Sequence, residues 1–347
     1  MTNQSPYKFQ SRRMQTLAAV LAVQGLCLSC LIGSLAAFQS KTTDEKPATT
    51  APQRGVTFVE PVDQHWRIGV RMKGGERTCK NVKVTIPMPI DWPEQSVKIV
   101  SKNVPGEVQR FEFRDTTPSV QQLVATIPSI RSGQLLEITV DVRVTSKKIV
   151  APADTNVYKI PKTVPKDMRE YLDISPGISF RDSKLRAMVK EVTEPEATSW
   201  DQVRAISRWI QTNIKQDGEE VVETVKCFRD RAGSNEDIVC LFVAMCRAHN
   251  VPARMVWVEG SQYAEFYLID DAGNGHWFPC SLVGWPEFGS LSHVLMIDQK
   301  GDNFRIPEYE NAQKYVLEYM VGEGANKPAV EFIRERIPAA EVGVGKQ

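Results

Sequence analysis

The residues best suited to nucleophilic chemistry in this chain are its cysteines and histidines. The 347 residues include seven cysteines and four histidines. A cysteine becomes an effective nucleophile when a histidine lies within hydrogen-bonding reach of its sulfur. Two of the cysteines lie in an apolar N-terminal segment, and the other five form no Cys-x-x-Cys pair. We therefore expect no zinc site, because such pairs are its usual signature, and no other metal or cofactor.

Residues 231–254 contain a helix whose start is a favourable place for a reactive thiol. The helix follows Gly233, is apolar from Ile238 to Cys246, and ends at a Val-Pro-Ala-Arg corner at residues 251–254. A helix N-terminus presents free N–H groups and the positive end of the helix dipole, and both favour a thiolate. The expected start, however, is Ser234 or Asn235, and neither is a cysteine. Asparagine can cap a helix, but it is no comparable nucleophile.

The elements around this helix follow from hydrophobic periodicity. Two amphipathic helices are predicted between residues 182 and 214, the second from a capping box that starts at Ser199. Three strands are predicted after the apolar helix, at 253–258, 263–269 and 276–280, with a hairpin loop between the last two. Residues 56–150 contain several short alternating runs separated by turns, which is typical of an antiparallel sandwich. The expected fold class is α+β.

The domain organisation follows from these patterns and from shifts in composition. We expect a signal peptide or membrane anchor at 1–40, a flexible linker at 41–55, an all-β immunoglobulin-like sandwich at 56–150, a connecting segment at 151–181, a second domain at 182–325 and a C-terminal tail at 326–347. Within the second domain, residues 311–320 are expected to form a helix or the final strand.

The N-terminal segment indicates an exported protein. Residues 17–38 are strongly apolar, follow Arg12 and Arg13, and are about long enough to cross a bilayer. Basic residues before such a segment place the N-terminus inside. The body is then either membrane-anchored outside the cytoplasm or, if the segment is cleaved, periplasmic or secreted. The 43 Lys and Arg nearly balance the 42 Asp and Glu, which argues against a nucleic-acid partner bound by bulk charge.

This order of elements resembles the transglutaminase-like superfamily, which has a papain-like cysteine fold. The resemblance rests on Gly233-x-Asn235-x-Asp237, the apolar run 241–248 that contains Arg247, and the corner at 251–254. In that family a catalytic cysteine stands at the helix start, about twelve residues before the arginine that matches Arg247. Asn235 occupies the matching position here. The family's histidine and aspartate positions match Ser261 and Ser281.

The resemblance implies a degenerate domain, because all three positions of the family triad are substituted. Our leading interpretation is a catalytically inactive peptide- or protein-binding or scaffold module of the cell envelope. The expected groove is lined by Asn235, Ser261, Gln262, Tyr263, Glu265 and Ser281.

Two alternatives stay open. The first is an active thiol enzyme, either a cysteine protease or amidase or a protein-glutamine transferase, that uses a non-standard pair. Its nucleophile would be Cys227, from the polar loop 216–232, or Cys280, and its base would be His276. That enzyme needs the sulfur close to the imidazole in a cleft. The second alternative is a purely structural tether.

Overall fold

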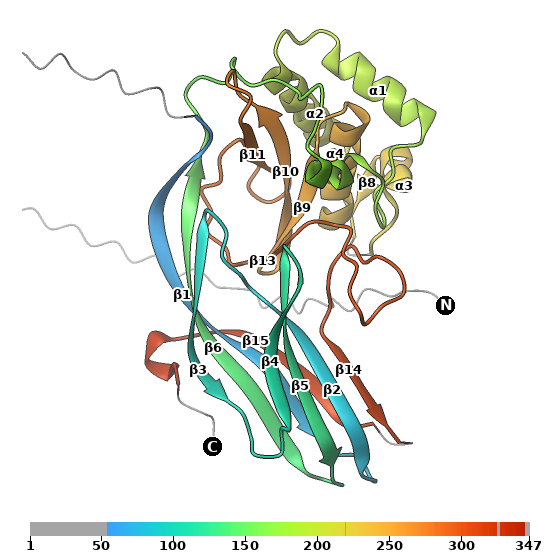
Figure 1. Ribbon diagram of the computed structural model, residues 1–347. Coiled ribbons are helices and arrows are strands. Elements are labelled where there is room, and N and C mark those ends of the chain that lie inside the picture. Colours follow the sequence, from blue (N-terminus) through green and yellow to red (C-terminus); the bar gives the residue numbers. More distant parts are fainter. Residues whose placement is uncertain (1–53, 219, 325–326, 344–347) are drawn as a thin grey trace, which may run out of the picture. The chain divides into compact units, whose positions relative to one another are not determined.

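The structure is a computed structural model that describes residues 54–218, 220–324 and 327–343 (Figure 1). Its first region consists of two antiparallel four-stranded sheets, in the orders β15-β1-β6-β3 and β14-β2-β5-β4. Side chains from β1 and β6 meet side chains from β2 and β5 in one buried apolar cluster. The strands are β1 (Thr57–Lys73), β2 (Cys79–Met88), β3 (Gln95–Asn103), β4 (Arg110–Thr117), β5 (Val120–Ile130), β6 (Leu135–Val150), β14 (Tyr319–Glu323) and β15 (Ala329–Ile337).

The end of the chain differs from the expected C-terminal tail at 326–347. Ala329–Ile337 forms β15, which pairs with β1 from His65↔Ile337 to Lys73↔Ala329. Among the described residues, 311–320 contain no helix, and a strand begins only at Tyr319. Both β14 and β15 are edge strands. Such strands bury few side chains and therefore carry a weak hydrophobic pattern, which explains why the sequence did not reveal them.

The second region packs helices against a five-stranded sheet of order β12-β11-β10-β9-β13. Figure 1 shows the labelled helices grouped beside β9, β10 and β11, and side chains of α4, β9, β10 and β11 share one buried cluster. The helices are α1 (Ser183–Thr193), α2 (Ser199–Asn213), α3 (Thr224–Asp230) and α4 (Asn235–Ala248). The strands are β9 (Ala253–Val258), β10 (Ser261–Ile269), β11 (Gly275–Ser281), β12 (Glu287–Phe288) and β13 (Ile297–Lys300).

Helix α4 is the central element of this second region. Every residue from Asp237 to Arg247 is buried, as expected for a helix that is apolar on all sides. Arg247 is compatible with this burial because its guanidinium pairs with Asp302 at 2.8 Å and donates to the carbonyl oxygen of Ala253. The predicted helices and strands of residues 182–282 are thus confirmed. The cap of α2 differs by one residue, since Thr198 rather than Ser199 accepts from the Asp201 N–H.

The remaining described elements are two short strands and two 3-10 helices. Strands β7 (Lys215–Gln216) and β8 (Ala232–Gly233) run parallel and flank α3, and the 3-10 helices η1 and η2 span Lys166–Leu172 and Ala339–Glu341.

The predicted signal peptide or anchor at 1–40, with its apolar stretch 17–38, lies outside the described residues. Within the described ranges, no helix combines the length and the apolar character that a bilayer crossing requires.

Candidate functional site

Helix α4 starts with a capping box that involves Ser234 rather than Asn235. The Ser234 Oγ accepts from the Asp237 N–H at 3.2 Å, and the Asp237 Oδ2 accepts from the Ser234 N–H at 2.9 Å. The other oxygen of Asp237 accepts from the Val222 N–H at 3.0 Å. These bonds satisfy free N–H groups at the helix start. Asn235 is therefore the first helical residue, and its side chain is not used for capping.

The side chain of Asn235 points instead to the start of β10. Its Nδ2 donates to the Ser261 Oγ at 3.0 Å, while its Oδ1 is buried and has no hydrogen-bond partner in the described structure. Asn235 and Ser261 are the residues that match the cysteine and histidine positions of the resembled family. The structure brings these two positions into direct contact.

Gly233, the residue before the N-cap of this helix, has to be a glycine for steric reasons. A Cβ at Gly233 would lie 2.8 Å from the Cβ of Asp237 and 2.9 Å from the Sγ of Cys227. Neither neighbour can move easily, because Asp237 is held by the capping box and Cys227 is fully buried. The close approach of the chain at Gly233 thus fixes where Asn235 enters the site.

A cavity of about 270 Å³ lies at this contact. Five of the six predicted groove residues line it, namely Asn235, Ser261, Gln262, Tyr263 and Ser281. The remaining lining residues come from distant parts of the chain, and they are Glu94, Ser146, Lys147, Ile149, Gln216, Val258, Val283, Gly284, Trp285, Leu291, His293, Val294, Leu295 and Ile297. The cavity therefore has a polar side at the former triad positions and an apolar side that includes Ile149 of β6, Leu291 and Leu295.

Tyr263 contributes a second unsatisfied polar group to this cavity. The side chain is 4% exposed and its hydroxyl has no hydrogen-bond partner in the described structure. Burial, together with the nearby Glu265 and Glu94, raises the pKa of Tyr263 well above its ordinary value. The hydroxyl therefore stays protonated and remains a hydrogen-bond donor.

Glu265 is the predicted groove residue that does not line the cavity. Its carboxylate accepts from the Arg254 Nε at 2.8 Å and from the Lys300 Nζ at 2.6 Å, and Lys300 also pairs with Glu94. The Arg254 guanidinium lies 4.0 Å from the centroid of the Trp277 ring. Burial alone would raise the pKa of Glu265, but Arg254 and Lys300 outweigh it and hold the pKa below its ordinary value. Glu265 is thus part of a closed ion network.

The two fallback nucleophiles are both inaccessible. Cys227 lies in α3 rather than in an exposed loop, and it is 0% exposed. Burial raises the pKa of Cys227 to about 12. Cys280 is also fully buried, with its Sγ 3.6 Å from the Ser207 Oγ and a pKa raised by burial to about 12. All five cysteines in the described residues are buried and unbridged.

The fallback base is engaged elsewhere. The Nε2 of His276 lies 2.9 Å from the Asp270 Oδ2, and this contact lowers the pKa of Asp270 to about 2. The His276 ring packs edge-on against Tyr158 with centroids 5.6 Å apart. On β11, His276 and Cys280 are four residues apart, which corresponds to roughly 13 Å along a strand. The proposed Cys280–His276 pair is therefore not formed.

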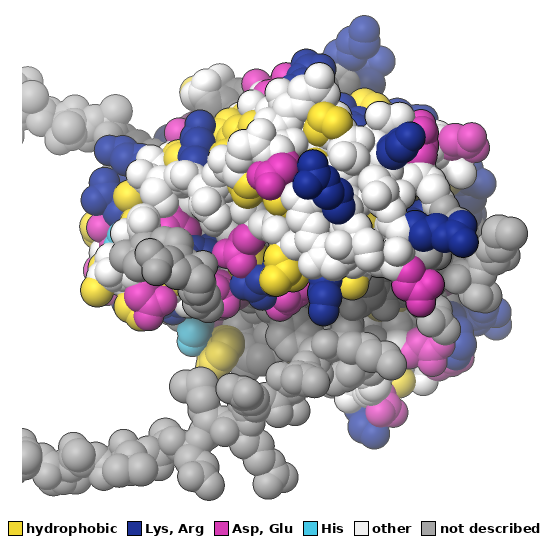
Figure 2. Space-filling model, turned by 90° about the horizontal axis from the view of Figure 1, so that it is seen from below, with side chains coloured by type: hydrophobic (Ala, Val, Ile, Leu, Met, Phe, Trp, Pro, Cys, Tyr) yellow, Lys and Arg dark blue, Asp and Glu magenta, His cyan; other side chains and the backbone are white. Residues whose placement is uncertain are grey.

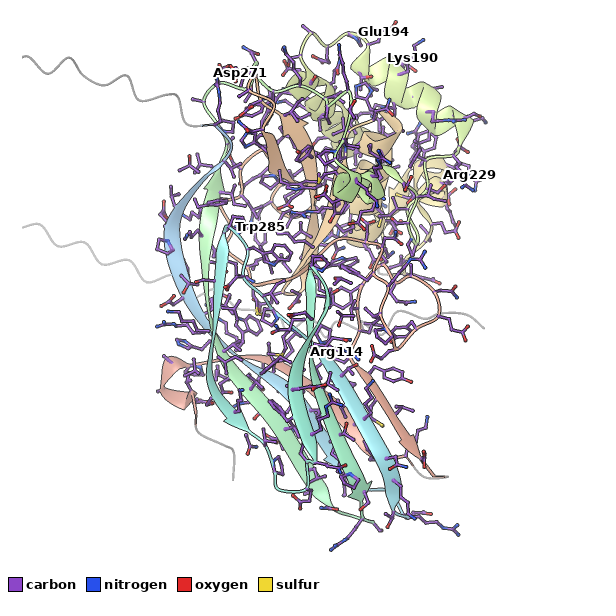
Figure 3. The ribbon with its side chains drawn as sticks, in the orientation of Figure 1. Arg114, Lys190, Glu194, Arg229, Asp271 and Trp285 are labelled. Carbon is purple, nitrogen blue, oxygen red and sulfur yellow. The ribbon has the colours of Figure 1, made fainter. Side chains whose placement is uncertain are left out.

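Sequence reasoning missed a histidine that lines the cavity. His293 stacks on Trp285 with ring centroids 4.1 Å apart, and its Nδ1 lies 3.3 Å from the Ser292 Oγ. Trp285, labelled in Figure 3, is 62% exposed. Lys147 was missed as well, because it reaches the cavity from β6. No local pattern in the sequence links these residues to Asn235.

One family model and one solved structure agree with this architecture. A family model described as the transglutaminase-like superfamily matches residues 186–285. The structure of a candidate cysteine protease from Cytophaga hutchinsonii aligns over 82% of this chain and 93% of that protein, with 13% identity and a TM-score of 0.53. The periplasmic domain of TgpA from Pseudomonas aeruginosa aligns over 67% of this chain and 94% of that domain, with 13% identity and a TM-score of only 0.32.

A search of the curated proteins gave no significant match. The family match spans helices α1 to α4 and strands β9 to β11, and α4, β10 and β11 among them supply the polar side of the cavity. Residues 186–285 of this chain are a domain of the transglutaminase-like superfamily.

Proposed function

We propose that this protein is a catalytically inactive peptide- or protein-binding module of the cell envelope, built on a transglutaminase-like domain. The observation that carries the proposal is the 3.0 Å contact between Asn235 and Ser261, with Ser281 lining the same cavity. At the place where the family's thiol and imidazole meet, this chain has an amide and a hydroxyl.

The chemistry of these groups supports binding without turnover. A carboxamide is not a nucleophile comparable to a thiolate, and a serine hydroxyl needs an adjacent base to become one. Among the described residues, no histidine hydrogen-bonds to Ser261 or Ser281. The alternative of a thiol enzyme has no support from Cys227 or Cys280, whose sulfurs are buried and protonated at neutral pH.

The cavity favours a binding module over a purely structural tether. A filled-in site would leave no space at Asn235, whereas here a cavity of about 270 Å³ remains with two unpartnered polar atoms beside it. Buried polar groups in proteins are nearly always satisfied, so unpartnered groups at a cavity point to an absent partner.

Location and further architecture belong to the same proposal. The apolar segment 17–38 after Arg12 and Arg13 supports export, with the body outside the cytoplasm. The two four-stranded sheets support an immunoglobulin-like sandwich as the first domain. Figure 2 shows basic and acidic side chains interspersed on the described part of one face, which supports a partner other than a nucleic acid.

The experiment that tests inactivity is thiol labelling of the folded protein with iodoacetamide at mildly acidic pH. We expect no labelling of the five buried cysteines, while the Asn235→Cys variant is labelled at residue 235 at least about tenfold faster than any of them, because a thiol there sits at a helix N-terminus. Peptide mapping separates these sites from Cys27 and Cys30, which lie outside the described residues. Rapid labelling of Cys227 or Cys280 in the unmodified protein would overturn the proposal in favour of the thiol enzyme.

A further inference from the structure

The cavity beside Asn235 contains more hydrogen-bond donors than the protein itself uses. The Ser261 Oγ accepts from Asn235, so its own O–H is free to donate. The Tyr263 hydroxyl is buried without a partner, and Ser281 lines the same cavity with no hydrogen bond from its side chain in the described structure. Three residues with an O–H group that has no acceptor therefore line one small cavity, and a ligand that supplies several oxygen acceptors would satisfy them.

The charge of the cavity favours an anionic ligand. Glu94 lines it but is neutralised by Lys300, and Glu265 behind it is neutralised by Arg254 and Lys300. Glu287, which pairs with Ser281 across the strands, has its oxygens engaged by the Ser292 N–H and hydroxyl. Lys147 also lines the cavity. Its backbone N–H donates to the Glu94 carbonyl oxygen, and its side chain has no hydrogen bond or ion pair in the described structure. The cation without a counter-charge in this lining is thus Lys147.

The other residues that line the cavity indicate which chemical groups the anionic ligand carries. The buried Asn235 Oδ1 is an acceptor without a donor, which suits a backbone N–H of a ligand. Ile149, Leu291 and Leu295 form an apolar side that suits an aliphatic side chain. The volume of about 270 Å³ lies just below the ~300–1,000 Å³ of sites for drug-sized ligands, so it fits the end of a chain better than a long segment.

We infer that this cavity binds the C-terminal residue of a peptide, through a free α-carboxylate and an aliphatic side chain. The inference rests on the proposed function and specifies its ligand. The carboxylate accepts from Ser261, Ser281, Tyr263 and Lys147, the residue's own N–H donates to the Asn235 Oδ1, and its side chain packs on the apolar side.

Three probes test this inference on the whole protein by isothermal titration calorimetry. They are acetyl-Ala-Ala-Leu with a free carboxylate, the same peptide with a C-terminal amide, and octanoate. We expect the free acid to bind at least about tenfold more tightly than the amide, because hydrogen bonds to a charged acceptor are roughly twice as strong as neutral ones. Octanoate, which lacks the backbone N–H, should bind more weakly than the free acid.

The outcomes separate this inference from the proposed function. Equal binding of the acid and the amide would overturn the inference that the cavity recognises a free carboxylate. The proposed function as a peptide-binding module would stand. Equal binding of octanoate and the peptide acid would overturn the peptide as occupant. Absence of binding by all three probes at millimolar concentration would overturn the inference and also remove the support that the cavity gives to the proposed function.

A matched pair of variants locates the binding on β6. Lys147→Ala should reduce the affinity for the free acid to that for the amide. Lys148→Ala is the control, because neighbouring residues of a strand point to opposite faces and Lys148 pairs with Glu60 at 2.6 Å instead. An unchanged preference for the acid in Lys147→Ala, or an equal loss in Lys148→Ala, would contradict the assignment. The unfolding midpoint of each variant confirms that both remain folded.

Discussion

One face of strand β10 contains two polar regions with opposite character. At its start, Ser261 and Tyr263 border a cavity, and the Tyr263 hydroxyl has no hydrogen-bond partner in the described structure. Two residues further along the same face, Glu265 is enclosed by Arg254 and Lys300, which satisfy its carboxylate completely. The separation between the two regions is less than 7 Å along the strand by the rise of a β-strand.

The difference teaches that polarity alone does not mark a site. The Glu265 network holds more charge than the cavity, yet its members saturate one another, so nothing remains for a ligand. The region around Asn235 and Ser261 has little charge but unsatisfied groups. In a low-dielectric interior a satisfied network stabilises one structure, whereas an unsatisfied group is costly until a partner binds. We therefore assign stability to one region and recognition to the other.

The largest loss of stability should come from removing the charge of Glu265 from its ion network. Glu265→Gln leaves Arg254 without its carboxylate partner and Lys300 with Glu94 alone, and we expect it to lower the free energy of unfolding by about 3–5 kcal/mol. Urea denaturation measures this change. Glu331→Gln is the control, because its ion pair with Arg71 is exposed and should change the stability by less than about 1 kcal/mol. A loss for Glu265→Gln as small as the control would mean that the network is not the stabilising region.

The same region should also determine a distinct dependence of stability on pH. Arg254 and Lys300 hold the pKa of Glu265 below its ordinary value in the folded protein. The stabilisation is therefore fully present above the unfolded pKa of about 4.3, and it is lost as the pH falls through the lower folded value. The stability difference between the unmodified protein and Glu265→Gln should shrink below about pH 4, as measured by urea denaturation at several pH values. A difference that grows in acid would refute this assignment.

The smallest change in stability should come from a substitution beside the cavity, at Tyr263. Tyr263→Phe removes a buried hydroxyl that has no partner, so we expect no loss of stability or a slight gain. Tyr158→Phe is the matched control, because the Tyr158 hydroxyl accepts from the Gly55 N–H at 2.7 Å and its removal should cost about 1–3 kcal/mol. Thermal unfolding of both variants measures the contrast. A clear loss in Tyr263→Phe would show that its hydroxyl is satisfied by groups of the protein.

Much of the second region was predictable from sequence because its signals are local. The apolar run from Ile238 to Cys246 predicts a buried helix, and the alternating strands after it lie where periodicity placed them. Counting back from Arg247 located Asn235, and the structure places that residue in contact with Ser261. A helix has a fixed rise per residue, so a spacing along the sequence becomes a fixed position in space.

The rest could not be predicted because it depends on contacts between distant segments. Glu265 was expected in the groove, but Lys300 and Glu94 come to it from β13 and from the loop before β3. Cys227 was expected in an exposed loop, but it lies in the short helix α3 and its sulfur packs against Gly233. Lys147 and His293 reach the cavity from segments that share no motif with Asn235. Periodicity gives the face of an element but not which other segment covers it.

The pairing of β15 with β1 and of β14 with β2 has a consequence for the order of assembly during synthesis. Both sheets of the first region need strands that are synthesised after those of the second region, from Tyr319 to Ile337. The second region has its last strand, β13, at Ile297–Lys300, so its strands are all synthesised before that point, and chains generally fold as their segments emerge. The region that comes first in the sequence is therefore the last to close. Until the final strands arrive, β1 and β2 each present an open edge to which another chain can pair.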